Sequence, residues 1–272
     1  MNITFIGGGN MAAALIGGLL KGKFYVPEEL SVVEVSDEAC AKLRSQFAIR
    51  ATTDIERGVA NSGVIVLAVK PQQLHEVCAQ LRGLLDSQLI VSIAGGIRAQ
   101  DIARWLNTQN IVRCMPNTPA LIQSGVTGLY ALPQVGTAQK EIAENILNAV
   151  GSSVWLQDEV MLDGVTAISG SGPAYVFYFI EAMQQAAREL GFNEAAAKRL
   201  VIDTFLGAAK LADASNDDVS VLRARVTSKN GTTERALLSM EKDDVKRHIV
   251  AAVHAAAVRS KEMGDELGGE SC

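Results

Sequence analysis

Residues 6 to 12 read Ile6-Gly7-Gly8-Gly9-Asn10-Met11-Ala12 and follow a short run of β-branched and aromatic residues. The stretch fits the pattern G-x-G-x-x-G/A, with Gly7, Gly9 and Ala12 in the three small positions. In that pattern the first glycine allows a tight turn, the second lets backbone approach a pyrophosphate, and the third small residue lets helix and strand pack closely. Placed between an expected strand and an expected helix, the stretch predicts a dinucleotide-binding site. The alternative is a glycine-rich turn without a ligand.

The first 157 residues alternate short apolar runs with helical patterns. Strands are expected at Asn2–Ile6, Leu30–Val35, Val64–Val69, Leu89–Ser92 and Ile111–Cys114. Helices are expected at Met11–Lys21, Asp37–Gln46, Gln72–Leu81, Ala99–Leu106 and Ala138–Val150. Nearly continuous apolar strands are typical of a parallel sheet covered on both faces. Val126–Tyr130 and Ser153–Leu156 can close that sheet as later strands, of either direction.

The character of the chain changes at about Val160, where strand patterns stop and Ala-rich helical periodicity begins. Helices are expected at Tyr175–Leu190, Glu194–Ala212, Thr232–Glu241 and Asp243–Leu267. The sequence therefore predicts an α/β Rossmann domain with a mostly parallel sheet, residues 1–157, followed by an all-helical domain, residues 158–272. The segment Ile249–Val258 is apolar on most faces, which predicts a helix-rich interface between subunits.

Composition narrows the class of protein. The chain has 272 residues, of which 48% are hydrophobic and 20% charged, as in folded globular proteins. Its net charge of −5 and lack of a basic tract exclude a nucleic-acid footprint. No apolar run is long enough for a membrane span, and no cleavable apolar segment opens the chain, so we expect a cytoplasmic protein. Four scattered cysteines predict reduced, mostly buried thiols and no metal site.

The end of the second expected strand should meet the adenosine ribose of a dinucleotide. The residues there are Glu34, Val35, Ser36 and Asp37. An acidic residue at this place binds a ribose 2′-hydroxyl, whereas a hydroxyl with an arginine accommodates a 2′-phosphate. Both kinds of side chain are present and no arginine is adjacent, so the pattern leaves the phosphate status of the cofactor open. Lys70, after another strand, can neutralise a cofactor phosphate or be a solvated loop lysine.

Two further loops follow expected strands and contain small residues or prolines, Ser92–Ile97 and Met115–Pro119. They leave room for a flat nicotinamide ring. Asn117 is expected either to contact the ligand or to form an Asx turn before Pro119. The Gly-rich segment Ser169–Tyr175 precedes a long helix; capping explains part of it, and the extra glycines suggest close approach to a ligand or partner subunit.

A second anion site is expected in the segment Arg225–Thr233, which places hydroxyl side chains and an Asn-Gly pair before a helix. Unpaired N–H groups at a helix N-terminus carry the positive end of the helix dipole and bind carboxylates. An ordinary loop with a Thr cap is the alternative. The three histidines do not form a catalytic set, which fits hydride chemistry, where the cofactor performs the difficult step.

Six segments together resemble the pyrroline-5-carboxylate reductase family along nearly the whole chain. They are Phe5–Leu15, Val66–Gln72, Arg113–Ala120, Ser169–Tyr175, Leu206–Leu211 and Val226–Thr233. The resemblance implies a Rossmann domain and a helical domain that interlocks with its two-fold mate, in a homodimer or a higher homo-oligomer built of dimers. It also implies reduction of 1-pyrroline-5-carboxylate to L-proline by NADPH, with NADH as the alternative cofactor.

The resemblance also implies roles for individual residues. Cofactor binding is expected at Ile6, Gly7, Gly8, Gly9, Asn10, Met11, Ser36, Ala68, Val69, Lys70, Pro71, Ile93, Ala94 and Gly95. Substrate binding is expected at Ser228, Asn230, Gly231, Thr232 and Thr233, together with Asn117. Thr233 is the candidate catalytic residue, as the hydrogen-bond donor to the imine nitrogen, directly or through water.

The chain departs from the family in two places. Lys229 and Asn230 replace a common Pro-Gly pair; Asn tolerates the left-handed conformation, and Lys229 adds a charge that can attract a carboxylate. Asp54-Ile55 stands where the family often has an Asn near the adenosine. Two other functions fit these residues less well. A 3-hydroxyacid dehydrogenase would need a catalytic Lys where this chain has Val176, and a dinucleotide-sensing scaffold would not need a second anion site.

Overall fold

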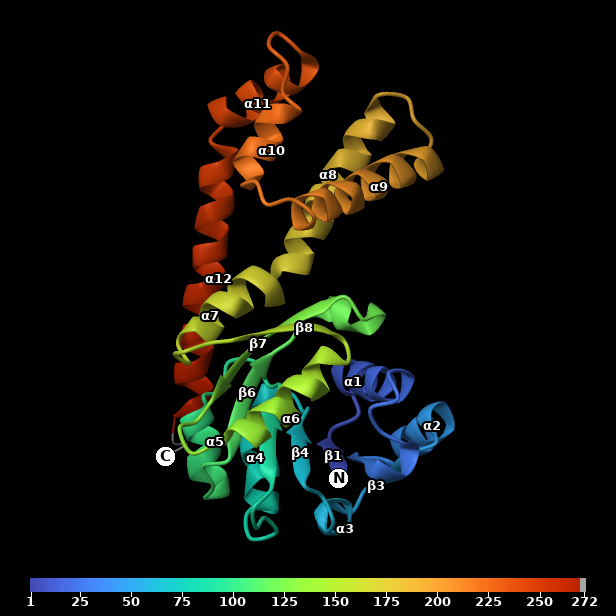
Figure 1. Cartoon of the computed structure of the whole chain (residues 1–272), viewed down its shortest axis with the longest axis vertical. Helices are drawn as coiled ribbons and strands as arrows, with labels where there is room; N and C mark the ends of the chain where they lie inside the picture. The colour runs from blue at the N-terminus through green and yellow to red at the C-terminus, as the bar shows by residue number, and fades with distance from the viewer. Residues whose placement is uncertain (270–272) are drawn as a thin grey trace. The chain divides into compact units, whose positions relative to one another are not determined.

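The computed structural model describes residues 1–269 of the chain. The chain divides into two compact units, each with its own helices (Figure 1). Unit 1 comprises Met1–Ser171 and the part of the chain from Ala256 onward, and unit 2 comprises Gly172–Ala255.

Within the described residues, unit 1 contains one eight-stranded sheet with the strand order β3-β2-β1-β4-β5-β6-β7-β8. The strands are β1 Ile3–Ile6, β2 Leu30–Val33, β3 Arg50–Thr52, β4 Val64–Leu67, β5 Leu89–Ser92, β6 Ile111–Met115, β7 Gly125–Ala131 and β8 Gly151–Trp155. Strands β1 to β6 are parallel, β7 is antiparallel to β6, and β8 is parallel to β7. The predicted, mostly parallel sheet is confirmed, and both later runs join it.

Two layers of helices cover this sheet. The helices of unit 1 are α1 Asn10–Lys21, α2 Asp37–Phe47, α3 Ile55–Val59, α4 Pro71–Leu81, α5 Ala99–Leu106, α6 Thr137–Asn148 and α7 Met161–Val165. Helix α1 packs against α2 and α6, while α4 packs against α3 and α5. Right-handed crossovers that run in opposite directions from the sheet centre place their helices on opposite faces. Strands β1, β2, β4 and β5 are consequently buried along their whole length, which explains their lack of polar alternation.

The sequence pattern did not predict three short elements of unit 1, namely β3, α3 and α7. Strand β3 has three residues at the sheet edge with a half-exposed pattern, and α3 has five residues. Elements this short carry too few residues for a detectable period. Strand β4 is also shorter than predicted, because it ends at Leu67 and the following residues leave the sheet.

The C-terminal half of helix α12, Val245–Gly268, belongs to unit 1. Its buried Ser260, Gly264 and Gly268 share one face of the helix. Ser260 Oγ donates to Asp163 Oδ1 at 2.7 Å, and Arg104 Nη2 donates to the Gly268 carbonyl at 2.8 Å. Helix α7 packs on β6 and β7, and a π-helical turn, Thr166–Gly170, follows it in the same unit. The division in space therefore does not coincide with the expected boundary between residues 157 and 158.

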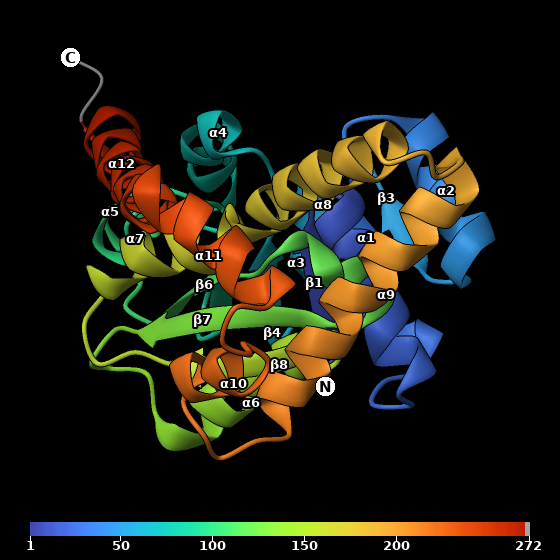
Figure 2. The ribbon, with the colours of Figure 1, turned by 90° about the horizontal axis from the view of Figure 1, so that it is seen from above.

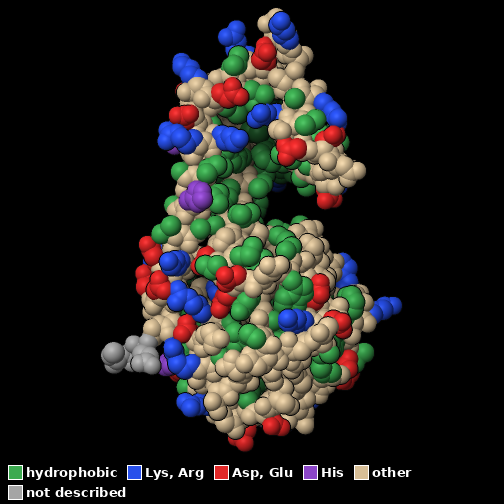
Figure 3. Space-filling view, turned by 60° about the vertical axis from the view of Figure 1, so that its left-hand side comes forward, with side chains coloured by type: hydrophobic (Ala, Val, Ile, Leu, Met, Phe, Trp, Pro, Cys, Tyr) green, Lys and Arg blue, Asp and Glu red, His purple; other side chains and the backbone are tan. Residues whose placement is uncertain are grey.

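Unit 2 is helical throughout, as predicted. It contains α8 Gly172–Glu189, α9 Glu194–Asp213, α10 Val219–Arg225, α11 Thr232–Lys242 and the first half of α12. Helices α8 and α9 lie side by side, as both ribbon views show (Figures 1 and 2). Apolar side chains gather on the surface of these helices (Figure 3). The exposed ones include Phe177, Tyr178, Leu200, Leu206, Leu211, Leu238 and Val250. None of the helices described in residues 1–269 combines the length and apolarity needed to cross a membrane.

Candidate active site

A cavity of about 340 Å³ lies in unit 1 at the carboxyl ends of β1, β2 and β4. Strand β1 pairs with β2 on one side and β4 on the other, so the strand order reverses at this point. Open α/β sheets bind ligands at such a switch point. The lining residues are Ile6, Gly7, Gly9, Val33, Glu34, Val35, Thr53, Ile55, Ala68, Val69, Lys70, Gln73, Glu76, Val77 and Gln80.

The glycine-rich loop has the geometry that a pyrophosphate requires. Gly7 has a φ of +96°, and a Cβ there would lie 2.9 Å from the carbonyl oxygen of Ala68, so neither the conformation nor the space suits another residue. Gly9 is the N-cap of α1, and a Cβ added to it would meet no atom within 4 Å. The backbone is therefore open to a phosphate at the positive end of the helix. These features fit the predicted nicotinamide dinucleotide.

A carboxylate is held against this loop. The Gly8 N–H donates to Glu34 Oε1 at 2.6 Å, and the Val35 N–H donates to Glu34 Oε2 at 2.9 Å. The neighbouring Ser36 is engaged elsewhere, because its Oγ caps α2 by accepting from the Ala39 N–H at 3.2 Å. At the end of β2, therefore, the Glu34 side chain lines the cavity and the Ser36 side chain does not.

The cavity lining includes part of the expected cofactor set. Ile6, Gly7, Gly9, Ala68, Val69 and Lys70 line it. Gly8, Asn10, Met11, Ser36, Pro71, Ile93, Ala94 and Gly95 do not, and their roles stay predictions. Sequence reasoning missed Thr53, which follows β3, and noted Ile55, the first residue of α3, only as part of a departure from the family near the adenosine. It also missed Gln73, Val77 and Gln80, whose spacing of four and three residues on a predicted helix places them on one face.

Asn117 has a structural role in unit 1. Its Oδ1 accepts from the Val126 N–H at 2.9 Å, and its Nδ2 donates to the Ser169 carbonyl at 3.2 Å. The side chain is buried and joins β7 to the π-helical turn, rather than capping the prolyl turn that follows it. Its expected contact with substrate stays a prediction and depends on the one amide hydrogen that these bonds leave free.

The second expected anion site lies in unit 2, at the start of α11. Gly231 is the N-cap, and its N–H donates to the Ser228 carbonyl at 3.0 Å. Asn230 has a φ of +59°, and its N–H donates to Glu234 Oε2 at 2.6 Å. The left-handed conformation expected of Asn230 is thus confirmed. The N–H groups of Thr232 and Thr233 belong to the first turn of α11 and have no hydrogen-bond partner among residues 1–269.

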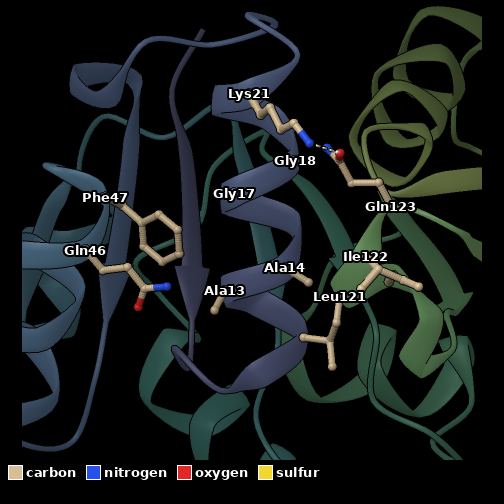
Figure 4. A pocket seen from close by; sticks show the side chains of 11 residues that line it. Ala13, Ala14, Gly17, Gly18, Lys21, Gln46, Phe47, Leu121, Ile122 and Gln123 are labelled. Atoms are coloured by element: carbon tan, nitrogen blue, oxygen red, sulfur yellow. Dashed lines mark hydrogen bonds between the residues drawn. The ribbon is translucent and has the colours of Figure 1, made fainter.

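Neither the histidines nor the buried cysteines have surroundings that suit a catalytic role. The three histidines are exposed, and His75 packs edge-on against Trp105. Burial raises the pKa of the Cys78 thiol to about 12 and also raises the pKa of Cys114, so neither thiol forms a nucleophile at neutral pH. A larger cavity, about 550 Å³, runs along α1 between Phe47 and Leu121, and it contains none of the predicted site residues (Figure 4). Among residues 1–269, no group of three or more potential metal ligands occurs.

The mostly parallel sheet, the glycine-rich turn and the cavity at the switch point define a dinucleotide-dependent oxidoreductase. Residues 2–96 match a family described as NADP oxidoreductase, coenzyme F420-dependent. Residues 159–263 match a family described as pyrroline-5-carboxylate reductase dimerisation.

Relatives along the whole chain then identify the family. The pyrroline-5-carboxylate reductase of Pseudomonas aeruginosa is 45% identical over 98% of each chain, and that of Pasteurella multocida is 40% identical over 96% of this chain and 97% of its own. A solved structure of the enzyme from Coxiella burnetii superposes with a TM-score of 0.90 at 40% identity, covering 96% of this chain and 98% of that one. The Plasmodium falciparum enzyme, solved with NADP bound, gives 0.88 at 30% identity, covering 97% and 98%. This chain belongs to the pyrroline-5-carboxylate reductase family.

Proposed function

We propose that the protein reduces 1-pyrroline-5-carboxylate to L-proline with NADPH or NADH, the last step of proline biosynthesis. The observation that carries this proposal is the start of α11, where two N–H groups without a partner among residues 1–269 belong to a segment that also holds the hydroxyl residues Ser228, Thr232 and Thr233. Such a site suits the carboxylate of a small acid. A scaffold that only senses a dinucleotide would not require it.

Some residues of the loop would bind the substrate carboxylate, and another would hydrogen-bond the ring nitrogen. The N–H groups of Thr232 and Thr233, with Ser228 Oγ nearby, would bind the carboxylate. When bound, the cofactor supplies the hydride that forms the new C–H bond at the imine carbon, and a proton is needed on the nitrogen. Thr233 Oγ1 would donate a hydrogen bond to that nitrogen and stabilise the negative charge that develops there as the hydride adds to the carbon. The hydroxyl is too weak an acid to supply the proton itself, so water is the proton source.

In unit 1, the glycine-rich loop would bind the pyrophosphate at the N-terminus of α1, and Lys70 would add a positive charge beside it. The family places the nicotinamide near Ile93, Ala94 and Gly95. These residues follow β5, on the β4 side of the switch point and away from β2. A dinucleotide extending from Glu34 across the glycine-rich loop would reach them.

The domain assignment is part of the proposal: residues 1–157 as the dinucleotide-binding domain and residues 158–272 as the substrate-binding and oligomerisation domain. The family match over 159–263 supports the second, as do the exposed apolar side chains of unit 2. An apolar surface of this kind is normally covered by a partner. We propose a homodimer, or a higher homo-oligomer built of dimers, in the cytoplasm.

The test is a reductase assay with purified protein, 1-pyrroline-5-carboxylate and each reduced cofactor in turn. We expect oxidation of the cofactor that depends on substrate and yields proline. Binding of a dinucleotide without turnover of this substrate by either cofactor would reject the reductase function. Size-exclusion chromatography with light scattering tests the assembly, and a monomeric protein would reject it.

A further inference from the structure

Glu34 is the acidic side chain of the cofactor cavity that lies at the end of β2. Its two carboxylate oxygens each accept one backbone N–H, from Gly8 at 2.6 Å and from Val35 at 2.9 Å. The side chain is partly buried, so the carboxylate is held in place before any ligand arrives. Each oxygen keeps a free lone-pair direction that can accept one more hydrogen bond.

The residues around Glu34 supply little positive charge to bind a 2′-phosphate on the adenosine ribose. The charged residues that line this cavity are Glu34, Lys70 and Glu76, and no arginine lines it. Lys70 is the N-cap of α4 and stands three residues after the end of β4. That position suits the pyrophosphate.

The arginines nearest in sequence lie elsewhere. Arg44, Arg50 and Arg57 line a separate cavity of about 510 Å³, and Arg44 Nη1 donates to the Ala51 carbonyl at 3.1 Å. Ser36, the hydroxyl expected to favour a 2′-phosphate, caps α2. Among the described residues, the lining of the cofactor cavity therefore contains one hydroxyl side chain, Thr53, and no arginine to offset the charge of a 2′-phosphate.

We propose that Glu34 makes this site selective for NADH over NADPH by accepting a hydrogen bond from the adenosine ribose 2′-hydroxyl. A 2′-phosphate in that place would bring a dianion against a fixed carboxylate, with no arginine to offset the repulsion. Val35, 92% exposed beside Glu34, supplies an apolar surface for the adjoining adenine. The inference rests on the dinucleotide site of the proposed function but not on its substrate.

The experiment measures equilibrium dissociation constants of NADH and NADPH for the purified protein by fluorescence titration, without substrate. We expect NADH to bind at least about tenfold more tightly than NADPH. In Glu34→Gln and Glu34→Ser the affinity for NADPH should rise and the ratio should approach or pass unity. Glu38→Gln is the matched control, because it removes the same charge from an exposed position in the first turn of α2, outside the cavity. Its ratio should equal that of the wild type.

Competition with adenosine fragments tests the contribution of the adenosine ribose to binding separately from that of the nicotinamide half of the cofactor. Against bound NADH, 5′-AMP should compete better than adenosine 2′,5′-bisphosphate in the wild type, and the order should reverse in Glu34→Ser. Equal or tighter binding of NADPH by the wild type overturns the selectivity and leaves the reductase proposal standing. An unchanged ratio in both Glu34 variants also overturns it. Failure of both dinucleotides to bind rejects the cofactor site itself and the proposed function with it.

Discussion

Arg113 Nη1 donates to Glu159 Oε1 at 2.9 Å, and both side chains are largely buried, with 6% and 17% of their surfaces exposed. The same carboxylate oxygen accepts the N–H of Ala99, the first residue of α5, at 2.6 Å. One carboxylate thus joins β6, the start of α5 and the segment before α7. A buried charge that loses its partner cannot be resolvated by water, so this pair is costly to break.

Replacing Glu159 by Ala should lower the free energy of unfolding by about 3 kcal/mol, because it leaves the Arg113 guanidinium and the Ala99 N–H unpaired. Glu141→Ala, at an exposed position on α6, is the control and should change the stability by no more than about 0.5 kcal/mol. Urea denaturation followed by circular dichroism measures both. A loss below about 1 kcal/mol for Glu159→Ala would show that the pair contributes little.

Two adjacent glycines on α1 should respond in opposite directions to the same substitution. A Cβ at Gly17 would meet only Phe47 Cε1 at 3.5 Å, so Gly17→Ala should stabilise the protein by up to about 1 kcal/mol through helix propensity. A Cβ at Gly18 would lie 2.5 Å from the carbonyl oxygen of Ala149, so Gly18→Ala should destabilise it by about 1–3 kcal/mol. Thermal or urea unfolding measures the change in the free energy of unfolding of each variant. Changes of the same sign in both variants would contradict the packing argument.

Thr233→Ala should reduce turnover by about tenfold to a hundredfold while the dissociation constant of the cofactor stays the same. The hydroxyl is proposed to act on the imine nitrogen, whereas the cofactor binds unit 1. Thr233→Ser should retain most of the activity, because it keeps the donor. Thr204→Ala, which removes an exposed hydroxyl bonded to the Leu200 carbonyl, serves as the control. Steady-state kinetics that match the wild type for Thr233→Ala would remove Thr233 from the mechanism.

Asn230 should tolerate glycine and reject β-branched residues. Its φ of +59° lies in the left-handed region, which costs a β-branched side chain about 1–2 kcal/mol. Asn230→Gly should keep the affinity for substrate, whereas Asn230→Val should raise KM several-fold by disturbing the turn before Gly231. Asn216→Val, at an exposed position before α10, controls for the loss of an amide side chain elsewhere in unit 2 and should leave KM unchanged. Equal KM values for Asn230→Gly and Asn230→Val would show that the conformation of this turn does not matter.

Much of the fold was predictable because its signals are local. Strands β1, β2, β4 and β5 are short apolar runs between helices, and α5 begins and ends at the predicted residues. The left-handed Asn230 was also predictable, since an Asn-Gly pair before a helix favours a tight turn. Elements of three to seven residues, β3, α3, α7 and α10, were missed because so few positions establish no period.

The candidate site was predictable only in part. The family relation and the glycine pattern placed the pyrophosphate loop and the start of α11. The sequence left open whether Glu34 or Ser36 would face the cavity, since both stand at the same strand end. Asn117 offered a similar choice, and its bonds to Val126 and Ser169 join it to partners nine and fifty-two residues away.

By itself the sequence determined the order of elements, the dinucleotide loop, the helical second half and the family. The tertiary structure alone decided that the Glu34 carboxylate meets the Gly8 N–H, that Ser36 lies outside the lining of the cofactor cavity, and that α12 returns to unit 1. The reason is the range of the forces involved. Periodicity, turn conformation and capping act over a few residues, whereas a hydrogen bond across a sheet edge depends on strand register and on the direction of each side chain.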